Sequence, residues 1–225
     1  MNVRRPYHSP LRAEQAAGTR SRIVEACVGL IRSGRELTVG AVAEAAGVQE
    51  RTVYRHFATK EALEAAVWTW IVENLTQAEL TASSEDELVN AMRRSFAGFE
   101  AGAALIEAML HSRQGLTIRQ SQQTARRAMF ERCAQAAVPD ADSERHTRLA
   151  AALQLLYSAT AWEQLRQFWG TDAEGAADIV ETAIRLVLAG ARHETTSAKR
   201  RERTRRIACT AHTATETTTI EGDPR

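Results

Sequence analysis

The sequence of 225 residues has few cysteines, few aromatic side chains and no long apolar run. Its three cysteines, Cys27, Cys133 and Cys209, are odd in number and far apart, so they fit neither a disulfide framework nor the spacing of a zinc site. No apolar run reaches the roughly 18 residues that a membrane-spanning helix needs. The first residues include arginines but no apolar stretch behind them, which argues against a secretory signal peptide. We therefore expect a cytoplasmic protein without a membrane partner.

Sequence patterns of enzymes and of cofactor sites are missing as well. Neither Gly-rich phosphate-binding pattern, GxGxxG or GxxxxGK followed by Ser or Thr, occurs. The six histidines are scattered, without a His/Glu/His helix pair or a Cys/His cluster. Asp140, Asp142 and Glu144 lie close together, but acids at a helix start usually complement the helix dipole. We expect no enzyme, no metal site and no cofactor.

The net charge is close to zero, but the charges are unevenly distributed. Residues 1–60 contain ten Lys or Arg and five acids, whereas residues 61–192 contain twelve Lys or Arg and eighteen acids. A basic front end on an acidic body is typical of a protein that touches nucleic acid with one domain only.

Residues 38–63 carry the pattern of two short helices joined by a tight turn. Apolar side chains recur at three- and four-residue steps over 39–46, which predicts a helix that Thr38 can cap. Gly47 then supplies the backbone freedom of a sharp turn, and a second helix is expected at about 49–57. This arrangement is a helix-turn-helix.

The side chains exposed by this segment are of the types that bind double-stranded DNA. Arg51 and Arg55 can pair with guanine edges and Gln49 with adenine. Five more residues are of types that donate to phosphate oxygens, namely Thr38, Thr52, Tyr54, His56 and Lys60. The alternative interpretation is a helical hairpin with a solvated basic face.

The run LTVGAVAEAAGVQERTVYRHFATKEAL resembles the signature of the TetR family of one-component transcriptional repressors, above all in YRHF at 54–57 and KEAL at 60–63. The resemblance is close from Thr19 to about Val72, and beyond that it extends only to length and layout. It implies that the 49–57 helix enters the major groove of an operator. It also implies that Thr38, Tyr54, His56 and Lys60 anchor phosphates.

Two residues depart from the family pattern. Gln49 stands where the family usually has Ser, and because Gln is a poorer N-cap the helix start is expected to lose about 1 kcal/mol. Arg51 stands where a small residue is common. Arg51 is therefore expected to be the residue most particular to this protein's operator.

The remaining chain predicts further helices and an all-α fold of two domains. Apolar stripes indicate helices at 19–32, 59–80, 85–100, 117–137, 143–169 and 173–192, with another between Gly102 and Gly115. We expect four regions: a flexible basic arm at 1–18, a three-helix helix-turn-helix domain at 19–63, a helical effector-binding and dimerisation domain at 64–192 and a disordered tail at 193–225. The last two helices have broad small-and-aliphatic faces, which suit close helix packing either inside a monomer or across a two-fold axis. The resemblance favours the second, as a four-helix bundle across a dimer.

The middle helices contain large, adaptable or aromatic residues of the kind that small-molecule pockets prefer. Candidate lining residues are Trp68, Met92, Phe96, Phe99, Met109, His111, Met129, Phe130 and Trp162, with Gln114 and Gln164 as further polar candidates. For each of them alone, ordinary core packing is the alternative. The family layout implies that some of them surround a cavity.

These features predict a homodimeric repressor that binds a palindromic operator and is released by a small apolar or amphipathic effector. The rival hypothesis is an effector-blind, architectural DNA-binding protein whose helical body only dimerises. An enzyme with a helical core is a distant third.

Overall fold

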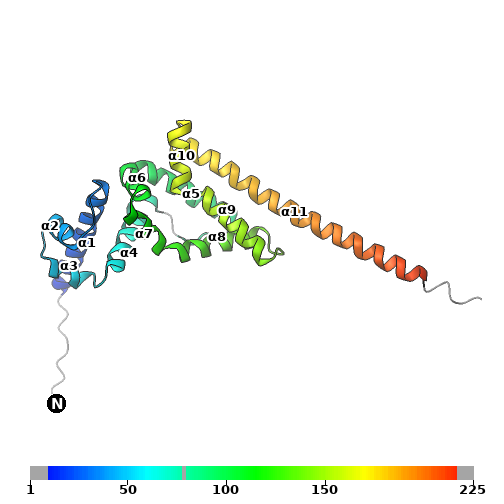
Figure 1. The fold of residues 1–225 in the computed structure, drawn as a ribbon, viewed down its shortest axis with the longest axis horizontal. Helices are drawn as coiled ribbons and strands as arrows, with labels where there is room; N and C mark the ends of the chain where they lie inside the picture. Colours follow the sequence, from blue (N-terminus) through cyan, green and yellow to red (C-terminus); the bar gives the residue numbers. More distant parts are fainter. Residues whose placement is uncertain (1–9, 78–79, 217–225) are drawn as a thin grey trace, which may run out of the picture.

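The structure is a computed structural model that describes residues 10–77 and 80–216, with side chains described for 12–77 and 80–197. Within these ranges every regular element is a helix, so the predicted all-α fold is confirmed. Figure 1 shows three N-terminal helices beside a larger helical body, from which the last helix projects on the side away from the N-terminal helices. No described helix combines the length and the apolar character needed to cross a bilayer.

The N-terminal unit consists of α1 (Pro10–Arg32), α2 (Val39–Ala46) and α3 (Glu50–His56). Its core is apolar, and Ile23, Val42 and Phe57 are buried in it. Helix α1 begins nine residues earlier than Thr19, the predicted start, so the prediction of a flexible arm is wrong for residues 10–18. Proline is well tolerated in the first turn of a helix, and the alanine-rich segment after it favours helix. The other predicted arm residues, 1–9, lie outside the described residues.

Helix α4 (Lys60–Ile71) continues into a π-helical segment, η1 (Val72–Thr76), which ends at Gln77 with a φ of 45°. The prediction of one helix over 59–80 missed this break. Helix α5 (Glu85–Ala101) passes η1 so closely that a Cβ on Gly98 would lie 2.1 Å from the carbonyl oxygen of Leu75. Only glycine fits at position 98, so this contact sets the distance between the two helices.

Helices α6 (Ala103–His111), α7 (Arg113–Ser121) and α8 (Gln123–Ala137) follow α5. The predicted helix at 117–137 is therefore two helices, divided at Gln122, and the first of them starts earlier. Ser112 caps α7, since its hydroxyl accepts a hydrogen bond from the backbone N–H of Gly115 at 3.0 Å.

The predicted helix at 143–169 is also two helices, α9 (Ser143–Leu156) and α10 (Ala159–Trp169). Ser158 caps α10 by accepting from the backbone N–H of Ala161 at 3.0 Å. Tyr157 stands at the break, and its hydroxyl donates to the carbonyl of Ala91 at 2.9 Å. Because this bond joins residues far apart in the chain, the local helix pattern could not reveal it.

Helix α11 (Ala173–Glu216) continues through the segment that was predicted to be a disordered tail. That prediction is wrong for residues 193–216, and residues 217–225 lie outside the described residues. The segment after Arg192 lacks an apolar stripe, but it also lacks Gly and Pro up to residue 216, and its Ala, Arg, Lys and Glu favour helix. Nothing in it therefore stops the helix.

Candidate functional site

The turn between α2 and α3 has the predicted local structure. The Thr38 hydroxyl accepts a hydrogen bond from the backbone N–H of Ala41 at 3.2 Å, and Gly47 has a φ of 64°. The side chain of Gln49, the N-cap of α3, makes no capping hydrogen bond. The expected weakness at the start of α3 is thus present in the structure.

The eight residues predicted to contact DNA lie on or beside α3. Six of them are exposed to solvent, namely Thr38, Gln49, Arg51, Tyr54, Arg55 and Lys60. Tyr54 is the largest exposed hydrophobic side chain of this unit, with an exposed fraction of 56 %. Thr52 and His56 are half-buried. Seven of the eight thus lie on the N-terminal unit, Lys60 begins the adjoining α4, and Thr38, Tyr54 and Lys60 line the same groove.

His56 differs from the others in its electrostatic surroundings. Its Nε2 is buried and has no hydrogen-bond partner among the described residues. Desolvation, followed by the positive charges of Arg55 and Arg20, lowers the pKa of His56 below its ordinary value. His56 is therefore neutral near pH 7, and its Nε2 cannot reach a phosphate in this conformation.

Lys60, at the start of α4, lies next to a buried acid. Its ammonium group is 3.9 Å from Oε1 of Glu64, whose side chain is almost fully buried. Burial raises the pKa of Glu64 above its ordinary value, and the charge of Lys60 only partly opposes that rise. Oε1 accepts no hydrogen bond among the described residues. The carboxylate is thus poorly solvated, and the ammonium group of Lys60 is the positive charge that partly balances it.

Glu64→Gln should raise the melting temperature at pH 7. The folded-state pKa of Glu64 lies above the unfolded value, so stability falls as the pH rises from the unfolded pKa to the folded pKa. The cost is complete above the folded pKa and absent below the unfolded pKa. The gain should therefore shrink as the pH falls toward 4.5. Thermal denaturation of both proteins from pH 4.5 to 8 measures it. A pH-independent difference would show that ionisation of Glu64 is not the cause.

A cavity of about 70 Å³ lies in the helical body, large enough for several water molecules. Its lining comes from α4, η1, α5, α6, α7 and α8 and from the segment around Tyr157. Five of the nine predicted pocket residues line it, namely Trp68, Phe99, Met109, Met129 and Phe130.

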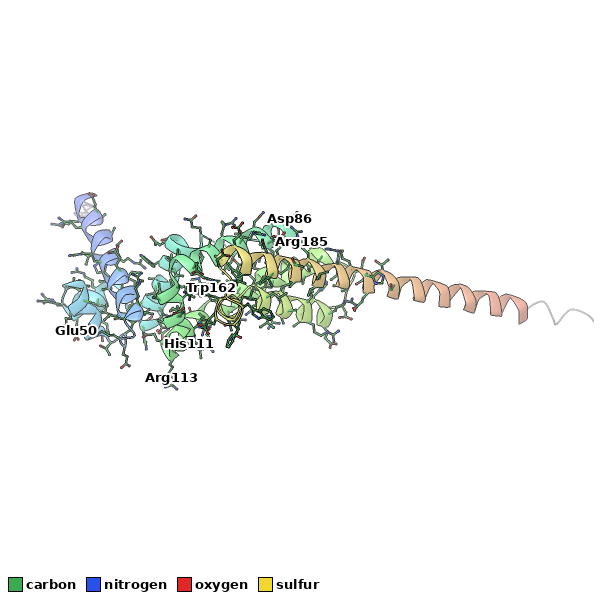
Figure 2. The ribbon with its side chains drawn as sticks, turned by 90° about the horizontal axis from the view of Figure 1, so that it is seen from above. Glu50, Asp86, His111, Arg113, Trp162 and Arg185 are labelled. Carbon is green, nitrogen blue, oxygen red and sulfur yellow. The ribbon has the colours of Figure 1, made fainter. Side chains whose placement is uncertain are left out.

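The other four predicted pocket residues lie elsewhere. Met92, Phe96 and Trp162 are fully buried in the core, and the rings of Phe96 and Trp162 pack against Phe99 with centroid distances of 5.9 and 5.8 Å. They support the cavity wall from behind. His111 is largely exposed, and its Nε2 lies 2.7 Å from the buried carboxylate of Glu163. In Figure 2 it lies nearer the edge of the molecule than Trp162 does.

The sequence interpretation missed the polar side of the cavity. Ser95, Arg119, Arg126 and Tyr157 all contribute to the lining. Tyr157 gives its hydroxyl proton to Ala91, so the 2.6 Å contact with Ser95 is a hydrogen bond from the serine hydroxyl to the tyrosine oxygen. Neither arginine was singled out from the sequence, and the break at Gln122 that lies between them was not predicted.

Gln114 lies outside the cavity lining and instead connects the helical body to the N-terminal unit. Its Oε1 accepts a hydrogen bond from the backbone N–H of Leu37 at 3.2 Å. Leu37 directly precedes Thr38, one of the predicted phosphate ligands. Helix α7, which carries Gln114, also packs along α4 and supplies Arg119 to the cavity. The two regions therefore share α4 and α7.

Large apolar side chains are exposed on the last three helices. Leu155 on α9, Phe168 and Trp169 on α10 and Leu186 on α11 have exposed fractions of 70, 73, 78 and 68 %. Ile184, two residues from Leu186, is by contrast fully buried inside the protomer. Helix α11 therefore has one face in the core and an apolar residue on another that nothing in the described chain covers.

Comparison with known proteins places these features in a family. A family model of bacterial regulatory proteins of the tetR family matches residues 32–67. A comparison with curated protein sequences gave no match. No group of three or more His, Cys, Asp or Glu suited to a metal occurs among the described residues.

Several solved structures share the fold. A candidate transcriptional regulator from Pseudomonas aeruginosa PAO1 has a TM-score of 0.54 and 19 % identity, covering 86 % of this chain and 98 % of that one. A TetR-like regulator from Rhodococcus sp. RHA1 has a TM-score of 0.53 and 18 % identity, covering 76 % and 96 %. A TetR-family regulator from Streptomyces coelicolor has a TM-score of 0.51 and 18 % identity, covering 82 % and 88 %. The match over 32–67 identifies this segment as the DNA-binding region of the TetR family of transcriptional regulators, and the solved structures show that the whole chain shares the fold of such regulators.

Proposed function

We propose that the protein is a repressor that binds a palindromic operator as a homodimer and leaves it when a small apolar or amphipathic effector fills the cavity. The effector part of this proposal rests on one observation: a single helix connects the DNA-facing surface to the cavity. Helix α4 begins at Lys60 beside the DNA-facing surface and contributes Trp68 to the cavity wall. A ligand that displaces Trp68 acts on the same rigid helix that positions Lys60.

The DNA-binding part rests on the exposed donors around α3. Arg51 and Arg55 are exposed on α3, with Gln49 at the helix start, and we expect these side chains to read base edges. We expect Tyr54 on α3, Thr38 at the start of α2 and Lys60 at the start of α4 to bind phosphates, whereas Thr52 and His56 are half-buried.

Lys60→Ala should weaken binding to all DNA sequences alike, because a phosphate contact positions the protein without reading bases. The slope of log affinity against log salt should fall by about one counterion per protomer. Tyr54→Phe should cost about threefold to tenfold without changing that slope, since it removes an uncharged donor. Fluorescence anisotropy over a salt series measures both.

Arg148→Ala is the matched control for these variants. Arg148 is exposed on α9 and pairs with Glu144 on the same helix, in the helical body and not in the DNA-facing unit. If Lys60→Ala and Tyr54→Phe both bind like this control at every salt concentration, the phosphate assignments are wrong.

Effector release is proposed to depend on two states of the N-terminal unit relative to the body. Filling the cavity would favour the state in which the two reading heads no longer match the operator spacing. The hydrogen bond from Leu37 to Gln114 belongs to the contacts that such a shift must change. An effector should therefore raise the melting temperature and lower operator affinity together.

Gln114→Ala should leave effector binding intact and reduce its effect on the operator. If the bond contributes to coupling, the effector-induced loss of operator affinity should fall from at least about tenfold to about threefold or less. Operator titrations with and without a compound found by thermal-shift screening measure this. Gln120→Ala, an exposed glutamine of α7, is the control and should keep full coupling.

The same screen separates the proposal from the architectural alternative. An effector-blind protein would show no compound that both raises the melting temperature and weakens operator binding. A compound that binds tightly in the cavity but leaves operator affinity unchanged would contradict effector release while leaving DNA binding intact.

A further inference from the structure

Two arginines border the cavity, and no acid does. Arg119 on α7 and Arg126 on α8 belong to the lining, whereas the lining among the described residues contains no Asp or Glu. Several arginines elsewhere in the helical body are paired with carboxylates. Arg93 contacts Asp178 and Glu181. Arg185 contacts Asp86, and these two residues lie close together in Figure 2. The cavity arginines depart from this pattern.

The guanidinium group of Arg126 makes no hydrogen bond and no ion pair with any described residue. Its guanidinium carbon lies 5.9 Å from the ring centroid of Trp68, a cation–π contact that leaves the N–H donors unused. Arg119 donates from Nε to the Gly115 carbonyl at 3.3 Å and from Nη2 to the Leu110 carbonyl at 3.4 Å. Both contacts are long and both acceptors are neutral, so neither charge is balanced.

Desolvation acts on both guanidinium groups. It lowers the pKa of Arg119 and of Arg126 below the ordinary value. Tyr157 partly opposes this for Arg126, whereas the positive charge of Arg119 adds to it. Two half-buried cations near each other without an anion are unfavourable. A bound anion would relieve both the desolvation and the repulsion, and it would receive charge-assisted hydrogen bonds.

The rest of the lining limits what else the ligand can be. Phe99, Ile106, Met109, Met129 and Phe130 present apolar surface to the cavity. The nearby hydroxyls of Tyr157 and Ser95 already donate to other acceptors, as described above. A ligand for this site therefore needs one anionic end for the arginines and an apolar body for the remaining wall.

We infer that the cavity binds an organic carboxylic acid, with the carboxylate at Arg126 and Arg119 and an aliphatic or aromatic body against Phe99, Met109 and Met129. This inference rests on the proposed effector site and names the class of its ligand. It excludes neutral lipophilic compounds as the preferred ligands.

Isothermal titration calorimetry of the full-length protein at pH 7.5 tests the inference with octanoate and phenylbutyrate against their primary amides. Each acid should bind about tenfold or more tightly than its amide, which has the same body without the charge. Arg126→Met should weaken binding of the acids by about 10- to 100-fold and change binding of the amides by less than about threefold. Arg126→Lys, which keeps the charge, should restore part of the affinity.

Arg127→Met is the matched control, because Arg127 is exposed and pairs with Glu131 on the same helix. It should leave the affinity for both acids unchanged. Thermal denaturation shows whether the variants fold. Without ligand, Arg126→Met should melt no lower than the wild-type protein, since it removes an unpaired desolvated charge.

Three results would overturn the inference: no binding of either acid, equal affinity for acids and amides, or equal losses in Arg126→Met and Arg127→Met. Failure of the proposed function looks different. If the acids bind through Arg126 but leave operator affinity unchanged, the inference holds and effector release is wrong. If the neutral amides bind more tightly than the acids and release the operator, the proposal of effector release is supported and the inference of a carboxylate ligand is wrong.

Discussion

Replacing Leu186 with Asp should convert the protein from a dimer to a monomer and abolish specific operator binding. Leu186 is exposed on α11 in the isolated chain, together with Leu155 on α9 and Trp169 on α10. If two copies pack through this surface, Leu186→Asp buries two like charges without partners, one from each copy. We expect operator affinity to fall at least about 100-fold while weak nonspecific binding persists.

Analytical ultracentrifugation and operator titration measure the two effects. Leu116→Asp is the control, because Leu116 is an exposed leucine on α7, outside the last three helices. Ile184→Asp on the same helix is unsuitable as a dimer-breaking change, because Ile184 is fully buried in the protomer and a buried carboxylate there would unfold the chain. A Leu186→Asp variant that remains dimeric would show that the dimer uses another surface.

Arg51→Ala should give the largest change in sequence preference. Arg51 is exposed in the second position of α3, and its planar guanidinium can pair with two acceptors of one guanine. Its loss should cost about 1–3 kcal/mol per half-site and relax preference at one symmetric pair of base positions. Titration against operators mutated one base pair at a time measures this. An equal loss on every sequence would mean that Arg51 contacts phosphate.

The sequence was most informative where local rules decide the structure. Thr38 and Thr59 cap their helices and Gly47 adopts a left-handed conformation, each as the residue type predicts. Family resemblance rested on the same segment, since its helix caps and turn require particular residues at particular positions. These features depend on neighbours within four residues, so a single sequence reveals them.

The sequence was least informative where the structure depends on contacts between residues far apart in the chain. The break at Tyr157 accompanies hydrogen bonds to Ala91 and Ser95, more than sixty positions away. The C-terminal extension of α11 beyond Arg192 was missed for another reason. A segment without an apolar stripe does not pack against a core, but it can still be helical.

The same contrast holds for the candidate sites: the DNA-contact residues were easier to predict from the sequence than the cavity lining. The eight DNA-facing candidates fall on one continuous segment, so their positions on or beside α3 could be predicted from spacing alone. Cavity lining depends on which side of each helix faces inward, and buried Met92 and Phe96 looked no different from Met109 and Phe99 in the sequence. The unpaired state of Arg126 became visible only once its surroundings were known.

Selection of binding sites from a pool of random double-stranded DNA tests the central claim, sequence-specific operator recognition by a two-fold dimer, most directly. A single α3 of seven residues reaches only a few base pairs, so specificity requires two copies. The wild-type protein should select a palindrome whose half-sites are spaced for two reading heads, and Arg51→Ala should lose preference at one symmetric pair of positions. A non-palindromic consensus, or an Arg51→Ala consensus unchanged at every position, would contradict the proposal.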